Sequence, residues 1–233
     1  MKSVILLPYC PLPQDSGAKS EMWKHLEALK ALGDCHIASA RSYPVGAGWT
    51  PEYLAEIRGR GFTVSLREEA RRLGFRQCAG IAYASVCKAL RLERAFGHSN
   101  PYHRHAFPVE WWKEQVRNAD LAVINYSYWA RLPCPCPKVI VLHDLWSDIM
   151  WGGARRETEE LKSAQAVIAI SKSDEEALKA RGLSRVLWSP PLVPARSFPL
   201  TDRIGATGSS NRFNREGLTW LQQGLHRRWL SVH

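Results

Sequence analysis

Short apolar runs alternate with longer amphipathic stretches along most of the chain. The runs are rich in β-branched and aliphatic residues, which is typical of strands buried on both faces of a sheet. The stretches between them repeat apolar positions every three or four residues, which is typical of helices packed on one side. The pattern predicts strands at 3–7, 35–40, 62–66, 120–126, 138–142, 166–171 and 185–189.

The intervening stretches carry helix signals of their own. The first places Met22, Leu26, Leu29 and Leu32 on one face, and Gly33 ends it. The last has Ser173 as its expected N-cap, acidic residues in its first turn and basic residues in its last. Helices are expected at 19–32, 51–58, 108–119, 155–164 and 171–182, with a basic helical pattern over 67–97.

Strands separated by helices indicate βαβ units, so the expected fold is α/β. It would be a Rossmann-like parallel sheet with helices on both faces. Residues 1–190 would form this domain, and the proline-rich segment 191–202 would be a linker. Residues 203–233 resemble the start of a second Rossmann-like unit, but one strand and one helix cannot bury a core. This second unit is therefore expected to be incomplete.

Polar and aromatic residues follow three of the predicted strands. His143 and Asp144 follow strand 138–142, the loop 8–17 follows the first strand, and Asn125, Tyr126 and Trp129 end or follow strand 120–126. Ligands of parallel sheets bind beyond the carboxyl ends of the strands, so these exits are expected to share one cleft.

Of the residues at these strand exits, His143 has the side chain best suited to hydrogen bonding and proton transfer. A histidine there could donate to a hydroxyl or phosphate oxygen of a ligand, or transfer a proton near neutral pH. The alternative is a structural histidine at the polar end of a core strand. Asp144 either orients His143 or caps the next turn. Asn125, Tyr126 and Trp129 are candidates for hydrogen bonding to a ligand and for stacking on it.

Gly17 precedes the first helix, where a glycine lets a phosphate approach the helix N-terminus. An ordinary loop glycine is the alternative. Lys19 would assist the binding of the phosphate or, as the favoured alternative, be solvated. For the cysteine pair Cys134 and Cys136, a stiff proline-rich loop is favoured over a metal site, since no second pair stands at zinc spacing. The histidine pair His103 and His105 is interpreted as a solvated loop, so no metal or cofactor is expected.

Composition narrows the class of protein. The 233 residues are 45% hydrophobic and 23% charged, as in soluble globular proteins. The N-terminal apolar run, 4–7, is too short for a signal peptide, and no run reaches the roughly 20 residues that span a bilayer. A cytoplasmic location is therefore expected, and the six cysteines are scattered, which favours reduced thiols. The net charge of +10 favours anionic partners or simply solubilises the surface.

Four segments, taken in order, resemble the retaining glycosyltransferases of the GT-B fold, in the family 4 group. They are 5–40, 139–149, 163–182 and 204–221. They are similar to that family's first strand, loop and helix, its histidine-bearing strand exit, the segment before its domain hinge, and the start of its second domain.

The resemblance implies transfer of a sugar from a nucleotide-sugar donor to a glycan or a lipid-linked acceptor, without a metal and with retention of configuration. It implies that His143 contacts the donor sugar and that Gly17, Lys19 and Gly208 lie near the donor phosphates. The acceptor would meet Asn125, Tyr126, Trp129 and Asp144. The family's diphosphate-binding basic residues and late glutamate pair have no counterpart. The chain is therefore expected to be a truncated, acceptor-side half with little activity alone.

Two further alternatives concern partners. The basic stretch 67–97 suits peripheral contact with the inner face of an anionic membrane. The alternative is a helix that packs on the sheet of its own domain. A non-catalytic basic Rossmann-like module for nucleic acid or a partner protein is the second functional hypothesis. Scattered rather than striped basic residues argue against nucleic acid. An α/β-hydrolase is disfavoured because the G-x-S-x-G motif is absent.

Overall fold

A computed structural model describes residues 1–41, 48–68, 82, 107–145 and 154–190. The chain divides into two compact units, Met1–Pro191 and Leu192–His233. The second unit lies outside the described residues, as do Gly208, His103, His105 and the basic stretch from 69 to 97 apart from residue 82. The elements below all belong to the first unit.

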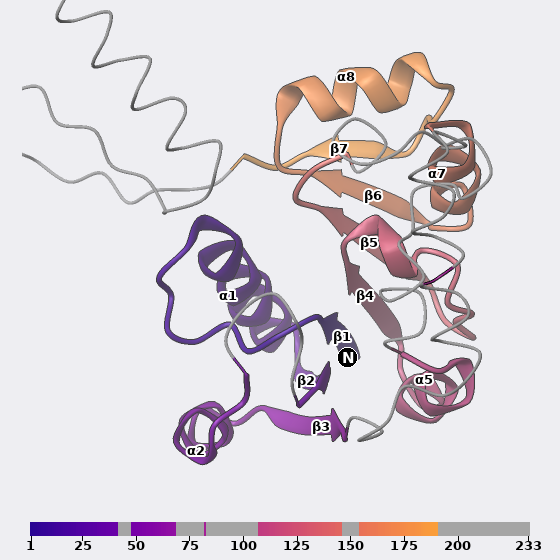
Figure 1. Cartoon of the computed structure of the whole chain (residues 1–233). Coiled ribbons are helices and arrows are strands. Elements are labelled where there is room, and N and C mark those ends of the chain that lie inside the picture. The colour runs from indigo at the N-terminus through magenta and orange to yellow at the C-terminus, as the bar shows by residue number, and fades with distance from the viewer. Residues whose placement is uncertain (42–47, 69–81, 83–106, 146–153, 191–233) are drawn as a thin grey trace, which may run out of the picture. The chain divides into compact units, whose positions relative to one another are not determined.

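One sheet of parallel strands forms the centre of this unit (Figure 1). Its order in the described residues is β3-β2-β1-β4-β5-β6-β7, with every neighbouring pair parallel. The expected α/β, Rossmann-like class is confirmed. The strands are β1 (Lys2–Leu7), β2 (Asp34–Ala40), β3 (Thr63–Arg67), β4 (Leu121–Asn125), β5 (Lys138–Leu142), β6 (Ala166–Ala169) and β7 (Val186–Trp188).

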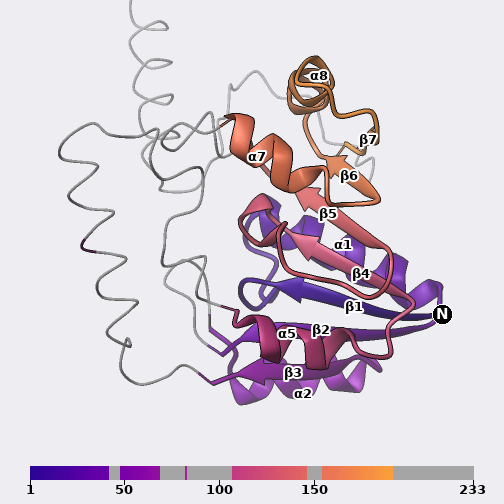
Figure 2. The ribbon, with the colours of Figure 1, turned by 90° about the vertical axis from the view of Figure 1, so that its right-hand side faces the viewer.

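Helices cover both faces of the sheet. α1 and α2 lie on one face, and α5 and α7 lie on the other (Figures 1 and 2). α8 packs against β6 and β7. The bounds are α1 (Gly17–Ala31), α2 (Pro51–Gly59), α5 (Val109–Val116), α7 (Ala154–Leu161) and α8 (Lys172–Ala180), with a 3₁₀ turn, η2, at Ser127–Trp129.

The central strands are apolar because helices cover both of their faces. After Lys2, every residue of β1 is buried. In the register, Ile5 of β1 pairs with Ile37 of β2 and with Val123 of β4, so three adjacent strands meet within the core. Because both faces are covered, the sequence shows continuous apolar runs at these strands rather than alternating apolar and polar residues.

The helix ends depart from expectation in three places. α1 begins at Gly17 rather than at 19, because the Ser16 hydroxyl accepts a hydrogen bond from the Lys19 amide and caps it. Ser171, not Ser173, is the N-cap of α8 and accepts from the amide of Asp174. Leu32 is 61% exposed and is the C-cap that follows α1, rather than a member of its buried face.

Gly33 ends the first helix as expected. Its φ is +144°, and a Cβ there would stand 2.3 Å from the backbone oxygen of Met1. Both the dihedral angle and the close contact therefore require glycine.

A buried lysine holds the loop between β4 and β5. The Lys138 ammonium donates to the carbonyl oxygen of Ala130, to that of Leu132 at 3.1 Å and to the hydroxyl of Ser163 at 2.9 Å. Burial lowers the pKa of Lys138. Among the described residues the charge is thus stabilised by three oxygen acceptors rather than by a carboxylate.

Candidate functional site

The strand order reverses between β1 and β4, and the candidate site lies there. Chain-consecutive strands run outward from β1 through β2 to β3, and then from β4 through β5 to β7 on the other side. At such a switch point the loops that follow the two central strands diverge and leave a crevice at their carboxyl ends. The carboxyl ends of β1, β4 and β5 point to the same edge (Figure 2).

Two tyrosines join the exits of β1 and β4. The hydroxyl groups of Tyr9 and Tyr126 are 3.1 Å apart. Burial raises the pKa of Tyr9, so its hydroxyl is neutral at ordinary pH. Tyr126 has φ of 71° and ψ of 145°, a backbone conformation that costs a non-glycine residue about 1–3 kcal/mol. Such strain is commonly retained at sites where side-chain direction matters.

His143 stands directly beyond β5 and packs on the same tyrosine. Its ring stacks on that of Tyr126, with the centroids 4.5 Å apart and an interplanar angle of 25°. It is 6% exposed, and its Nε2 lies 3.1 Å from Oδ1 of Asn125. Burial, followed by the charge of nearby His25, lowers the pKa of His143 to about 3. The ring is therefore neutral at pH 7.

One nitrogen of this histidine has no hydrogen-bond partner in the part of the chain that the structure describes. Among the described residues, no group hydrogen-bonds to Nδ1 of His143, although the atom is buried. A buried polar atom without a partner destabilises the fold by about 1–3 kcal/mol, so it calls for a functional or structural explanation.

Two of the expected acceptor-side residues lie inside the protein. Asn125 is buried and is hydrogen-bonded to both β1 and His143. Trp129 is 1% exposed, with its ring edge-on to that of Phe107 at 4.9 Å. Tyr126 is the member of this expected group that is partly exposed at the strand exit. The side chains of Asn125 and Trp129 therefore face the interior rather than solvent.

Asp144 is exposed. Partial burial of its carboxyl group nevertheless raises its pKa. In the described part of the chain, no hydrogen bond joins it to His143; the histidine is oriented by Asn125 instead.

The N-terminus of α1 follows the loop after β1, at the same edge of the sheet. Gly17 is its first residue, and a Cβ added there would meet nothing within 4 Å. Neither crowding nor a positive φ requires a glycine, so its effect is to leave the helix terminus open. The prediction that Lys19 is solvated is wrong: Lys19 is 5% exposed, and its ammonium lies 2.8 Å from a carboxylate oxygen of Asp15. Hydrogen bonding from Lys19 lowers the pKa of Asp15.

Sequence reasoning missed three residues near the site. The Ser127 hydroxyl donates to a carboxylate oxygen of Glu157 at 2.5 Å, and both side chains are buried. The contact ties the turn after β4 to α7. Glu157 stands in a run of charged residues that is typical of a solvated helix, so nothing in the local pattern distinguishes it. Tyr9 lies in the loop expected after the first strand, but nothing in the sequence marks it as a site residue among the other residues of that loop.

Metal ligands are not grouped in the described residues, where no cluster holds three or more histidine, cysteine or acidic side chains. Cys134 and Cys136 are half-buried free thiols, and burial raises the pKa of both. None of the helices described is long and apolar enough to cross a membrane.

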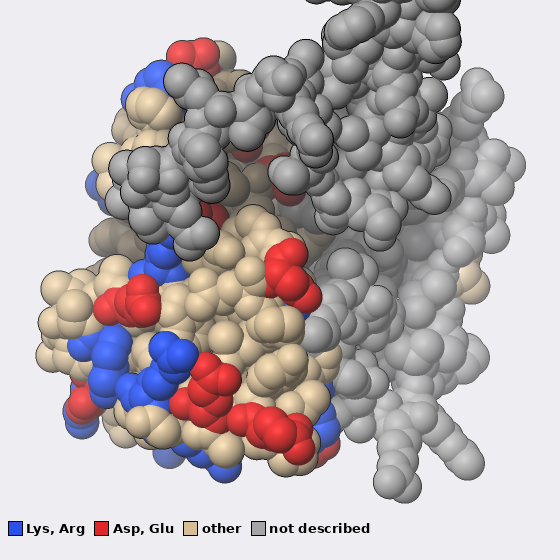
Figure 3. Space-filling view, turned by 90° about the vertical axis from the view of Figure 1, so that its left-hand side faces the viewer, with Lys and Arg blue, Asp and Glu red and all other residues tan. Residues whose placement is uncertain are grey.

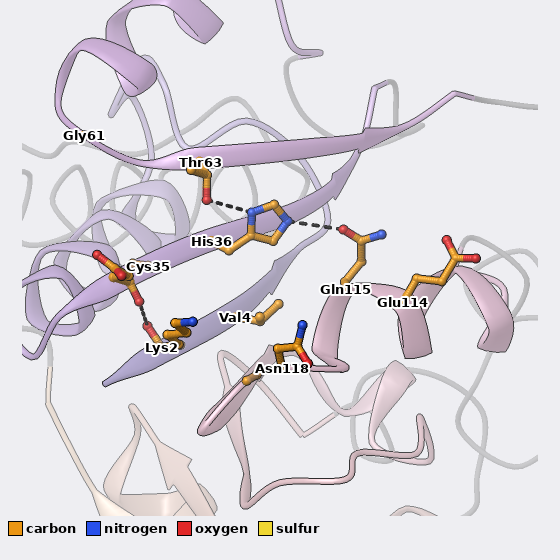
Figure 4. A pocket seen from close by; sticks show the side chains of 12 residues that line it. Lys2, Val4, Cys35, His36, Gly61, Thr63, Glu114, Gln115 and Asn118 are labelled. Carbon is orange, nitrogen blue, oxygen red and sulfur yellow. Dashed lines mark hydrogen bonds between the residues drawn. The ribbon is translucent and has the colours of Figure 1, made fainter.

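A hollow lies at the amino ends of β1, β2 and β3, beside α5 and at the opposite edge of the sheet from His143 (Figure 4). Its volume is about 450 Å³. His36 lies in it, with Nδ1 2.8 Å from the hydroxyl of Thr63 and Nε2 3.2 Å from Oε1 of Gln115. Both ring nitrogens thus have side-chain partners, whereas among the described residues only Nε2 of His143 has one.

Comparisons with known proteins find similarity among solved structures. Neither the models of protein families nor the curated proteins match the chain. Among solved structures, the apo form of the lipopolysaccharide outer core galactosyltransferase WaaB is similar, at 14% identity and a TM-score of 0.43. The alignment covers 80% of this chain and 44% of that one. A superposition this loose assigns neither fold nor function, and the fold rests on the strand topology described above.

Proposed function

We propose that the chain belongs to a glycosyltransferase that moves a sugar from a nucleotide-sugar donor to a glycan or lipid-linked acceptor. The observation that carries the proposal is the meeting of Tyr9, Tyr126 and His143 at the switch point of a parallel sheet. The ordered resemblance of four segments to the family 4 group supports a sugar as the ligand.

The chemistry of these three side chains suits a carbohydrate. Tyr126 is partly exposed, but its ring stacks on the rings of His143 and Tyr128, so a sugar would meet its edge and hydroxyl group rather than an open face. Neutral His143 and the tyrosine hydroxyls offer hydrogen bonds without a charge. A neutral, polar and aromatic site discriminates sugars by hydroxyl position, and Asp144 would add an exposed carboxylate acceptor at its rim.

The donor diphosphate would lie at the N-terminus of α1. Amide groups and the helix dipole stabilise anionic oxygens there, and Gly17 leaves room for them. Lys19 adds a positive charge one turn away, partly neutralised by Asp15. Stabilisation of a leaving diphosphate by dipoles and cations needs no metal ion.

Binding by the 233-residue chain tests the proposal. Saturation-transfer NMR with UDP-glucose, UDP-galactose and GDP-mannose should show contact with the sugar protons. Gly17→Ala should weaken nucleotide-sugar binding about tenfold, the equivalent of one hydrogen bond to a charged group, with an unchanged melting temperature. Gly59→Ala is the matched control, because a Cβ there also meets nothing within 4 Å. Gly59 is the last residue of α2 and is not part of the candidate site.

Two results would contradict the proposal. One is that none of the three nucleotide sugars binds to the folded chain. The other is that Gly17→Ala binds them as well as Gly59→Ala does, which would remove the helix terminus from the site.

The alternative function, a basic module for nucleic acid, gains no support from the face that carries α1 and α2. On the described part of that face, basic and acidic side chains are interspersed (Figure 3). Arg60 pairs with Glu56 at 2.8 Å and Lys24 with Glu21 at 2.6 Å. A nucleic-acid surface needs a continuous basic patch, which paired charges do not supply.

A further inference from the structure

Asn125 connects the central strand β1 to His143. Its Nδ2 donates to the backbone oxygen of Leu6 at 3.3 Å, and its Oδ1 lies 3.1 Å from Nε2 of His143. Because the amide nitrogen is committed to the Leu6 carbonyl, only the amide oxygen faces the histidine. An oxygen without a hydrogen accepts only, so Nε2 of His143 must carry the proton and donate.

The state of the other ring nitrogen is then determined as well. A neutral imidazole has one N–H, so protonation at Nε2 leaves Nδ1 with a free lone pair. The ring is neutral at pH 7 because burial disfavours its charged form. Nδ1 is therefore an acceptor, and the residues described supply no donor for it.

His36 shows what the missing donor would be (Figure 4). The Gln115 amide donates from Nε2 to the oxygen of Trp111 at 3.3 Å, so its Oε1 accepts from Nε2 of His36. The Thr63 hydroxyl then donates to Nδ1 of His36 at 2.8 Å. The two histidines thus share one arrangement, an amide oxygen on Nε2, but only His36 has a hydroxyl on Nδ1 among the residues described.

We propose that Asn125 is a positioning residue that fixes His143 as the Nε2–H tautomer, so that Nδ1 accepts a hydrogen bond from a hydroxyl group of the bound sugar. The ligand hydroxyl takes the place that Thr63 takes at His36. The identity of the ligand rests on the proposed function, whereas the tautomer does not. A phosphate oxygen does not fit, because a lone pair repels an anionic acceptor. The Tyr126 ring, stacked on His143, holds the plane of the imidazole.

NMR of the 233-residue chain labelled with ¹⁵N at histidine tests the tautomer directly. His143 is assigned by the resonances lost in His143→Gln. At pH 7 the parent protein should show a protonated nitrogen at Nε2 and an unprotonated one at Nδ1, a measurement that needs no variant at Asn125. Asn125→Leu should abolish this preference, whereas Asn125→Asp, which keeps an acceptor oxygen, should retain it. His36 should keep its pattern in both variants.

Three probes test the ligand group. UDP-glucose and methyl glucoside should each move the Nδ1 resonance of His143 toward the hydrogen-bonded range, and pyrophosphate alone should leave it unmoved. Asn125→Leu should weaken the binding of UDP-glucose about three- to tenfold, as expected for loss of one oriented hydrogen bond.

Each contrary result has its own meaning. An Nδ1–H tautomer in the parent protein, or an unchanged tautomer in folded Asn125→Leu, overturns the role of Asn125. A response to pyrophosphate without a response to the sugars overturns the hydroxyl assignment. The expected tautomer without a response to any probe overturns the sugar ligand, and with it the proposed function, while Asn125 keeps its positioning role.

Discussion

Acidification should destabilise this protein through His143 in particular. The pKa of His143 is lowered from 6.5 to about 3 by burial and by His25. In the unfolded chain the ring returns to its ordinary pKa, so between these two values the unfolded state binds one more proton than the folded state. The contribution of His143 to the free energy of unfolding is therefore greatest above pH 6.5, falls as the pH decreases through this window, and stops falling near pH 3.

The size of the loss is set by the two pKa values. At pH 5 the unfolded histidine is almost fully protonated and the folded one almost fully neutral. Linkage then predicts that this one group lowers the free energy of unfolding by about 2 kcal/mol between pH 8 and pH 5. Such a loss is a large part of the stability of a typical domain.

Comparison with His143→Gln isolates the contribution. Glutamine keeps an N–H for Asn125 but cannot be protonated, so the variant should lose about 2 kcal/mol less than the parent over this range. Burial also lowers the pKa of His25 and of His36, but their contributions are common to both proteins. Urea unfolding at pH 8 and pH 5, followed by tryptophan fluorescence and by circular dichroism, gives the four free energies.

Equal losses in the two proteins would refute the reasoning. They would mean that His143 takes up its proton in the folded protein at nearly the same pH as in the unfolded chain. In that case the ring is solvated and Nδ1 is not a buried acceptor.

Further predictions concern backbone strain, a buried charge and a helix cap. In urea unfolding, Tyr126→Gly should be more stable than Tyr126→Ala by about 1 kcal/mol. Both variants lose the ring, but only alanine retains the strain of a positive φ. The reverse order would show that no strain is stored there. Lys138→Met should lower the free energy of unfolding by about 2–4 kcal/mol, because three oxygens lose their donor. The exposed control Lys113→Met should change it by less than about 0.5 kcal/mol. Equal melting temperatures of the two variants would contradict this prediction. Ser16→Ala should cost about 1 kcal/mol by uncapping α1, and an unchanged value would mean that the bond to the Lys19 amide contributes nothing.

Local pattern determined the elements of this fold. The apolar runs at 3–7 and 138–142 became β1 and β5 within a residue, because a strand covered on both faces must be apolar at nearly every position. The position of His143 beyond a strand could also be predicted, since a polar residue marks where such a strand leaves the core. The exact helix starts could not, because two serines near one terminus compete for the cap, as Ser171 and Ser173 do.

Tertiary structure alone decided how these elements form a site. Periodicity does not encode which strands pair, and it is the position of β1 between β2 and β4 that brings Tyr9 against Tyr126. Burial of a charged or polar side chain likewise depends on what packs over it, so Lys19 is expected in solvent from its sequence context and is enclosed in the fold. The tautomer of His143 depends on the Leu6 carbonyl, 119 positions before Asn125. A hydrogen bond across that separation exists only once the sheet has assembled, and for that reason no local pattern in the sequence could contain it.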